Sequence, residues 1–235
     1  MKTFINRFLL IFSLFSALFY SAQMTNSTSD SVLVNKIPDL IPQKINGKVG
    51  YVNHNRDFVI APKFHIAMFF NPDCNLLNSS NPNAKKYGTK DFATVELNEI
   101  AYRINKSGKI VYKYDKKDLA KCTTPYKAQK YQAYVMKGFY GLVDKDIINE
   151  ADYRDFVIYP QYQRLHVMEG DDIDNPMIVA VYNNKFGVIT KTGKVVIPFI
   201  YADIKMNYSW KLGKMFEVSL DGKNYFYVDE NNVAY

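Results

Sequence analysis

One segment recurs along this chain, and its recurrence restricts the fold to a repeat architecture. Residues 183–201 read NNKFGVITKTGKVVIPFIY, which is a turn, a short apolar run, a second turn and a β-branched run. With Gly187 as position zero, a turn residue follows at position three and Gly193 at position six. Related segments have their anchor residues at positions 50, 102, 141, 187 and 226. The sequence therefore predicts about five copies of one small unit.

The spacing of the anchors becomes regular once two insertions are allowed for. Successive anchors are 52, 39, 46 and 39 residues apart. A seven-residue insertion between Asp144 and Phe156 explains the third spacing, and the polar loop Asn71–Lys86 absorbs the excess in the first. The predicted unit is about 39 residues long.

Each unit has the pattern of an antiparallel meander. Residues 177–181 alternate between apolar and other side chains, as in a half-buried strand, and Asn183-Asn184 suit a tight hairpin turn. The anchor lies on a second strand and residues 195–197 form a third, which Pro198 is expected to end because proline cannot donate to a strand ladder. The expected strands are 129–135, 139–144, 177–182, 185–190, 194–197, 215–220 and 224–229, with a short fourth segment around Tyr201.

A meander of this size cannot bury its own apolar face, so neighbouring units must pack against each other. We expect an all-β fold of tandem meanders in an elongated or curved stack, with a closed propeller-like ring as the alternative. No amphipathic helix of any length is expected.

The repeated segments resemble the WG-repeat family, a group of bacterial β-rich tandem repeats. The resemblance rests on an aromatic or apolar residue before the anchor glycine and on an Ile-Pro-type segment after it. These are Phe186-Gly187, Tyr140-Gly141 and Val49-Gly50, followed by Ile197–Tyr201, Ile158–Tyr162 and Ile60–Phe64. No anchor carries the family's tryptophan, and the copies at Tyr102 and Phe226 lack the glycine. The resemblance implies a β-repeat fold and an interaction role, with no catalytic residues to transfer.

Residues 1–22 have the pattern of a secretory signal peptide. Lys2 and Arg7 precede the apolar run Phe8–Tyr20, and the small residues Ser21-Ala22 follow it. The run is shorter than the roughly 20 apolar residues of a membrane-spanning helix. We therefore expect cleavage, with an uncleaved membrane anchor as the alternative.

The remaining chain divides into a lead-in and one domain. Residues 23–36 form a polar, flexible lead-in, and residues 37–235 form a single β-repeat domain. The protein is expected to be exported to the periplasm or the extracellular space, with no stable membrane span after signal cleavage.

The two cysteines are candidates for a disulfide bond. Cys74 and Cys122 lie 24 and 20 residues after the anchors at 50 and 102, which are nearly equivalent places in adjacent units. Paired cysteines in an oxidising compartment commonly form a bridge. The alternative is that both are free, because the loop Asn71–Lys86 displaces Cys74 from its repeat position.

No residue pattern indicates catalysis or metal binding. His54, His65 and His166 fall at different repeat positions, and none has a metal-ligand spacing to another donor or a nucleophile motif nearby. The acidic run Glu169–Asn175 lacks the ligand ladder of a calcium loop and is expected to be a solvated connection. We expect no catalytic residue, no metal site and no cofactor.

The charge and the repeats together favour a binding role. The net charge is +7, or +5 without Lys2 and Arg7, and the lysines are dispersed. Export argues against a nucleic-acid partner, and the 19 tyrosines and 16 phenylalanines are expected mainly in packing. The expected function is a non-catalytic binding or scaffolding module for a protein or an envelope polymer such as peptidoglycan or polysaccharide. The alternatives are an envelope hydrolase with its site in the inserted loops and a structural surface protein without a specific ligand.

Overall fold

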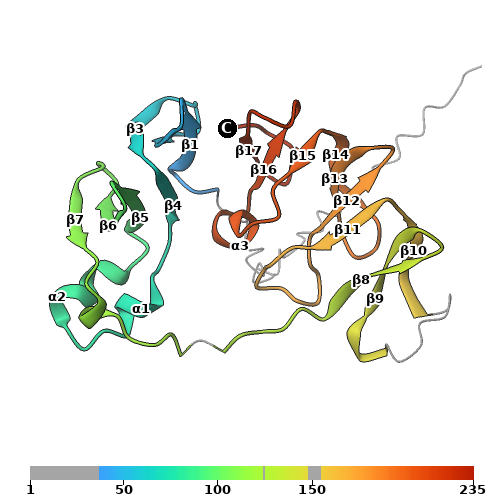
Figure 1. Ribbon diagram of the computed structural model, residues 1–235, viewed down its shortest axis with the longest axis horizontal. Coiled ribbons are helices and arrows are strands. Elements are labelled where there is room, and N and C mark those ends of the chain that lie inside the picture. The colour runs from blue at the N-terminus through green and yellow to red at the C-terminus, as the bar shows by residue number, and fades with distance from the viewer. Residues whose placement is uncertain (1–36, 124, 148–154) are drawn as a thin grey trace, which may run out of the picture. The chain divides into compact units, whose positions relative to one another are not determined.

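Five antiparallel sheets make up the part of the chain that the computed structural model describes, which is residues 37–123, 125–147 and 155–235 (Figure 1). These residues lie in one unit, residues 35–235, and the expected signal peptide lies outside the described residues. The predicted all-β fold is confirmed, and none of the sheets closes into a barrel.

We name the sheets A to E in chain order. Sheet A contains β1 (Ile41–Ile45), β2 (Lys48–Val52) and β3 (Phe58–Phe64), and sheet B contains β4 (Ile66–Phe70), β5 (Phe92–Leu97), β6 (Ile100–Asn105) and β7 (Ile110–Lys113). Sheet C contains β8 (Tyr131–Met136), β9 (Phe139–Asp144) and β10 (Phe156–Tyr162). Sheet D contains β11 (Arg164–Val167), β12 (Ile178–Tyr182), β13 (Lys185–Ile189) and β14 (Val195–Tyr201), and sheet E contains β15 (Asp203–Ile204), β16 (Phe216–Ser219) and β17 (Phe226–Val228).

The helices of the described residues are all short. They are α1 (Cys74–Leu77), α2 (Pro82–Lys85) and α3 (Ser209–Gly213), with 3-10 turns η1 (Lys86–Gly88), η2 (Lys116–Asp118) and η3 (Lys145–Ile147). Among them is no helix with the length and apolar character needed to cross a membrane.

The expected fourth segment around Tyr201 exists, but it belongs to the next sheet. The chain leaves sheet D along β14, turns at Ala202 and enters sheet E as β15. The same passage joins β3 to β4 at His65 and β10 to β11 at Gln163. We call residues 58–70, 156–167 and 195–204 the crossing segments. The first part of each crossing segment is the last strand of one sheet, and its second part is the first strand of the following sheet.

Proline does not end the third strand, contrary to the expectation for Pro198. β14 continues through Pro198 to Tyr201 because β13 and β14 pair through a bulge. Val188 pairs with Ile197 and Phe186 pairs with Tyr201, so the β14 strand has two more residues in this interval than β13. The proline lies inside the bulge, where the ladder needs no N–H donor.

The anchor glycine faces this bulge, and a copy without the bulge does not need the glycine. A Cβ atom on Gly50 would come within 2.4 Å of the Ile60 carbonyl oxygen, and the bulge recurs in sheets A and C. In sheet B the anchor is Tyr102, and it pairs directly with Lys113 without the two-residue shift. Loss of the glycine therefore accompanies loss of the bulge.

The core consists of clusters between sheets. Tyr51, Ile60 and Phe64 of sheet A pack with Ala93 and other residues of sheet B. Similar clusters join sheet C to sheet D and sheet D to sheet E. A fourth cluster places Ile41 and Val52 of sheet A against Met215, which precedes β16. The first and last sheets are therefore in contact, although they are farthest apart in sequence.

Candidate binding groove

A groove of about 1160 Å³ lies between sheet A and sheet E. One wall comes from β1, the hairpin turn after it and the corner between β3 and β4, and the other comes from β15 to β17 and the residues around them. The lining includes Pro42, Gln43, Lys44, Ile45, Arg56, Phe58, His65, Ile66, Lys205, Asn207, Glu217, Lys223, Tyr225, Phe226, Tyr227 and Tyr235.

The sheet A wall is an edge strand held by a tight turn. Asn46 and Gly47 have φ angles of 49° and 77°, the left-handed conformation that a two-residue hairpin requires. β1 pairs with β2 on one side, and sheet order β1-β2-β3 leaves its other side without a strand among the described residues. The exposed side chain of Ile45 adds apolar surface beside this edge.

Contacts with residues 233–235 hold the two walls together. Arg56 donates from Nε and Nη2 to the Ala234 carbonyl oxygen at 3.2 and 2.9 Å. Tyr235 donates its backbone N–H to Tyr227 O at 2.8 Å, and its ring lies edge-on to that of His54. Beside the groove, the ring of Phe69 in sheet B contacts that of Tyr227 in sheet E, with centroids 5.2 Å apart. The groove is thus built from contacts between the two ends of the described chain.

The groove is predominantly cationic. Lys44, Lys205 and Lys223 line it, and none forms an ion pair within the part of the chain that the structure describes. Lys205 Nζ lies 4.1 Å from the centroid of the Tyr225 ring, a cation–π contact that leaves its charge uncompensated. Glu217 is the one acidic side chain among the lining residues, and it accepts a hydrogen bond from Asn207 Nδ2 at 2.7 Å.

The tyrosines of the groove add no negative charge at neutral pH. A hydrogen bond to Asp203, together with burial, raises the pKa of Tyr225 to about 12. Burial also raises the pKa of Tyr227 and of Tyr235 above the ordinary tyrosine value. These rings therefore offer neutral aromatic surface and hydroxyl groups beside the lysines.

The three histidines are not brought together. His54 Nε2 lies 2.9 Å from Pro38 O, and His65 Nε2 lies 2.6 Å from Lys48 Nζ. His166 lies on β11, where burial and then Arg164 lower its pKa. His65 lines the groove, but no arrangement of nucleophile, base and orienting group accompanies it among the described residues.

The acidic run Glu169–Asn175 forms a turn stabilised by its own side chains. Asp172 Oδ1 accepts the backbone N–H groups of Asp174 and Asn175 at 3.1 and 2.9 Å. Lys130 pairs with Asp174 and Lys214 pairs with Asp171. No group of three or more potential metal ligands occurs in the described residues.

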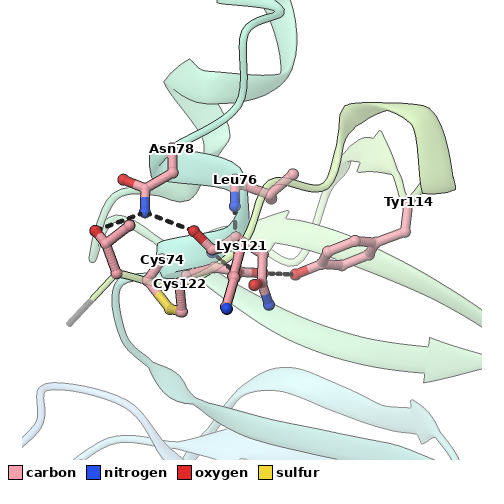
Figure 2. The surroundings of a disulfide bond; sticks show 9 residues. Cys74, Leu76, Asn78, Tyr114, Lys121 and Cys122 are labelled. Atoms are coloured by element: carbon pink, nitrogen blue, oxygen red, sulfur yellow. Dashed lines mark hydrogen bonds between the residues drawn. A yellow bond between two sulfur atoms is a disulfide. The ribbon is translucent and has the colours of Figure 1, made fainter. Parts of the chain in front are cut away.

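Cys74 and Cys122 are joined as a disulfide, with Cα atoms 5.3 Å apart (Figure 2). Cys74 begins α1 in the first inserted loop, and Cys122 lies in the connection between sheets B and C. Asn78 Nδ2 donates to Lys121 O at 3.1 Å beside the bridge (Figure 2). The bridge therefore ties the insertion to the connection that follows sheet B.

A buried polar cluster around Arg103 was not predicted from the sequence. Its guanidinium donates to the carbonyl oxygens of Tyr87, Thr89 and Asn71 and to Thr94 Oγ1, at 2.9–3.0 Å. The residues that follow the other anchors are apolar or aromatic. An arginine at this core position was therefore the sequence feature that could have predicted the cluster. The cluster fixes the insertion of residues 71–89 against sheet B. These four hydrogen bonds engage the guanidinium of Arg103 and indicate a structural role for it.

Comparison with known families identifies the repeat. A family model described as WG containing repeat matches residues 186–223, which begin beside the anchor Gly187 and end after β16. The resemblance to WG repeats is thereby confirmed, and the class is an all-β protein with a WG-type repeat. Comparisons with curated proteins and with solved structures gave no match.

Proposed function

We propose that this protein is an exported, non-catalytic module that binds a protein or a cell-envelope polymer, and that the groove between sheets A and E is the binding site. The observation that carries the proposal is a groove of about 1160 Å³ lined by three lysines without ion-pair partners among the described residues. Concave sites that combine apolar and aromatic walls with a few charged groups are typical of ligand binding.

The residues of the groove favour binding over turnover. Hydrolysis requires a nucleophile or an acid and base at close range. The carboxylate of Glu217 is held by Asn207, and the hydroxyl of Tyr225 donates to Asp203. Of the two insertions that were the alternative locations for a hydrolytic site, the first is held by Arg103, which donates hydrogen bonds to the carbonyl oxygens of Asn71, Tyr87 and Thr89. The second, between Asp144 and Phe156, lies largely outside the described residues.

The test uses protein purified from cells that export it. Cosedimentation with peptidoglycan sacculi and binding to immobilised envelope polysaccharide and envelope proteins measure association. The same mixtures, analysed for released fragments, measure turnover. The proposal expects association with one of these components and no fragments.

Two sets of variants test where the association occurs and whether the histidines are needed for it. Reversal of charge in Lys205→Glu/Lys223→Glu is expected to weaken it, whereas reversal in the exposed pair Lys109→Glu/Lys194→Glu outside the groove should not. His54→Ala, His65→Ala and His166→Ala are expected to leave association largely intact. A hydrolytic activity that any of these histidine substitutions abolished would overturn the non-catalytic assignment.

A further inference from the structure

The groove occupies a place that a strand fills in three of the other four sheets, since sheet C, like sheet A, has no first strand of this kind among the described residues. In sheets B, D and E a first strand, β4, β11 or β15, pairs with the outer edge of the next strand. In sheet A the corresponding edge is that of β1, which has β2 as its one strand neighbour in the described residues. The groove runs along this edge.

One hydrogen bond marks the equivalent position in the filled sheets. The N–H at the corner of each crossing segment donates to a carbonyl of the neighbouring strand. The pairs are His65 N to Glu96 O at 2.9 Å, Gln163 N to Val181 O at 2.8 Å and Ala202 N to Ser219 O at 2.8 Å. In sheets B and D the acceptor lies one residue before the end of its strand, and the sheet A residue at that position is Lys44. No corner residue lies beside it in the described part of the chain.

The β1 hairpin directs the backbone hydrogen-bonding groups of its outer edge toward the groove. A two-residue turn makes its flanking residues, Ile45 and Lys48, a hydrogen-bonded pair. Alternation then turns the backbone groups of Pro42 and Lys44 away from β2. Pro42 has no N–H, so the outer edge presents the Lys44 N–H and the two carbonyl groups. Gln43 also lines the groove, and its buried Oε1 has no hydrogen-bond partner among the described residues.

The opposite wall is also incompletely paired. Residues 233–235 run beside β17 with a bridge between Ala234 and Val228 and a bond from Tyr235 N to Tyr227 O. This pairing stops at Tyr227, and Tyr225 and Phe226 face the groove. In sheet D, β14 pairs with the equivalent edge of β13 as far as Phe186.

The groove has room for an added strand. At about 3.3 Å per residue, 4.8 Å between strands and 10 Å between sheets, four or five residues of strand fill roughly 600–800 Å³. The groove volume of about 1160 Å³ exceeds this. The first strands β11 and β4 contain four and five residues.

We propose that an extended acidic segment of a partner protein adds to the outer edge of β1, in the place that β4, β11 and β15 take in sheets B, D and E. This inference rests on the proposed function and specifies that the partner is a protein with an extended acidic segment. Strand addition supplies main-chain hydrogen bonds, and side-chain pockets supply selectivity. Lys44, Lys205 and Lys223 favour an acidic segment over a second copy of this chain, whose net charge is +7.

The probe is a synthetic peptide of residues 163–168, which contains the corner residue and β11, with Arg164→Glu and His166→Glu. It keeps Leu165 and Val167, the β11 residues that pack in the core, and adds acidic charge. A second peptide of the same sequence is N-methylated at alternate residues, which blocks strand pairing without changing side chains. Polygalacturonate serves as a polyanion without a peptide backbone. Binding is measured by titration calorimetry with the exported protein.

The proposal expects the unmethylated peptide to bind and N-methylation to weaken binding by about tenfold or more. Lys205→Glu/Lys223→Glu should weaken it about tenfold, and Lys109→Glu/Lys194→Glu should not. Backbone amide signals of Lys44 should shift on binding.

Three outcomes would overturn the proposal. They are equal binding of both peptides, polygalacturonate binding as tight as that of the peptide, and no binding of either peptide. Self-association that Lys205→Glu/Lys223→Glu abolishes would assign the edge to a second copy instead. Association with an envelope component that survives this double substitution would leave the binding role standing and would overturn the assignment of the groove as its site.

Discussion

Gly187 lies so close to the carbonyl oxygen of Ile197 that a Cβ atom at this position would be 2.8 Å from it. The contact exists because β14 bulges toward β13, and the same approach occurs at Gly50 and Gly141. The glycine of the repeat is therefore a requirement of strand pairing within one sheet.

We predict that Gly187→Ala lowers the free energy of unfolding by about 1–3 kcal/mol, the usual cost of overpacking. Gly50→Ala should cost more, because its three nearest neighbours are all backbone atoms, whereas Gly187 also meets the movable ring of Phe199. Chemical denaturation measures both. Gly170→Ala is the control, because a Cβ there meets Trp210 at an ordinary 3.4 Å, and its effect should stay within about 0.5 kcal/mol. Equal effects at Gly170 and Gly187 would contradict the steric explanation.

We predict that the protein, when purified from an oxidising compartment, has no reactive thiol until it is denatured and reduced. Cys74 and Cys122 are bridged across a sequence separation of 48 residues. Replacing both with serine should lower the free energy of unfolding by about 2–4 kcal/mol, because the bridge restricts the unfolded chain. Thiol titration and denaturation of the double variant provide the measurements. Two reactive thiols in the native protein would rule out the bridge.

We predict that Arg103→Leu destabilises the protein by about 2–4 kcal/mol, although leucine occupies the equivalent core position in sheet C. The substitution leaves the carbonyl groups of Tyr87, Thr89 and Asn71 without their donor. Arg103→Lys should not restore stability, because one ammonium group cannot reach the same set of acceptors. Denaturation and limited proteolysis of residues 71–91 measure the effect.

The control for Arg103 is Arg164→Leu on β11, where the side chain is exposed. Its effect should be within about 0.5 kcal/mol. Comparable losses at the two arginines would show that burial and hydrogen bonding do not account for the role of Arg103.

We predict that stability falls as pH rises from about 10 to about 12. Burial, and then the hydrogen bond to Asp73, raises the pKa of Tyr114 from the ordinary tyrosine value of 10.0 to about 12. In this interval the folded protein holds a proton that the unfolded chain has lost, so stability is fully present below pH 10 and declines above it. Tyr114→Phe should reduce the slope, as measured by denaturation between pH 9 and 12. An unchanged slope would show that Tyr114 does not titrate as assigned.

Sequence patterns predicted the local structure well because strands and turns depend on neighbouring residues. The expected strand at residues 139–144 matches β9, and those at 177–182 and 185–190 match β12 and β13 to within one residue. The error at Pro198 arose because a proline ends a regular strand but fits a bulge. A bulge depends on the partner strand, which local pattern does not specify.

The sequence by itself determined an all-β repeat, through the alternation of apolar residues, the turn residues and the anchor spacing. These features suffice because hairpin geometry is fixed over a few residues. The tertiary structure decided which sheets meet. Arg56 bonds to Ala234, a residue 178 positions away, and this contact brings the sheet A and sheet E walls of the groove together. Arg103 likewise acquires its partners from an insertion that breaks the repeat. Such contacts depend on side chains and backbone groups that only the packed sheets bring within hydrogen-bonding distance.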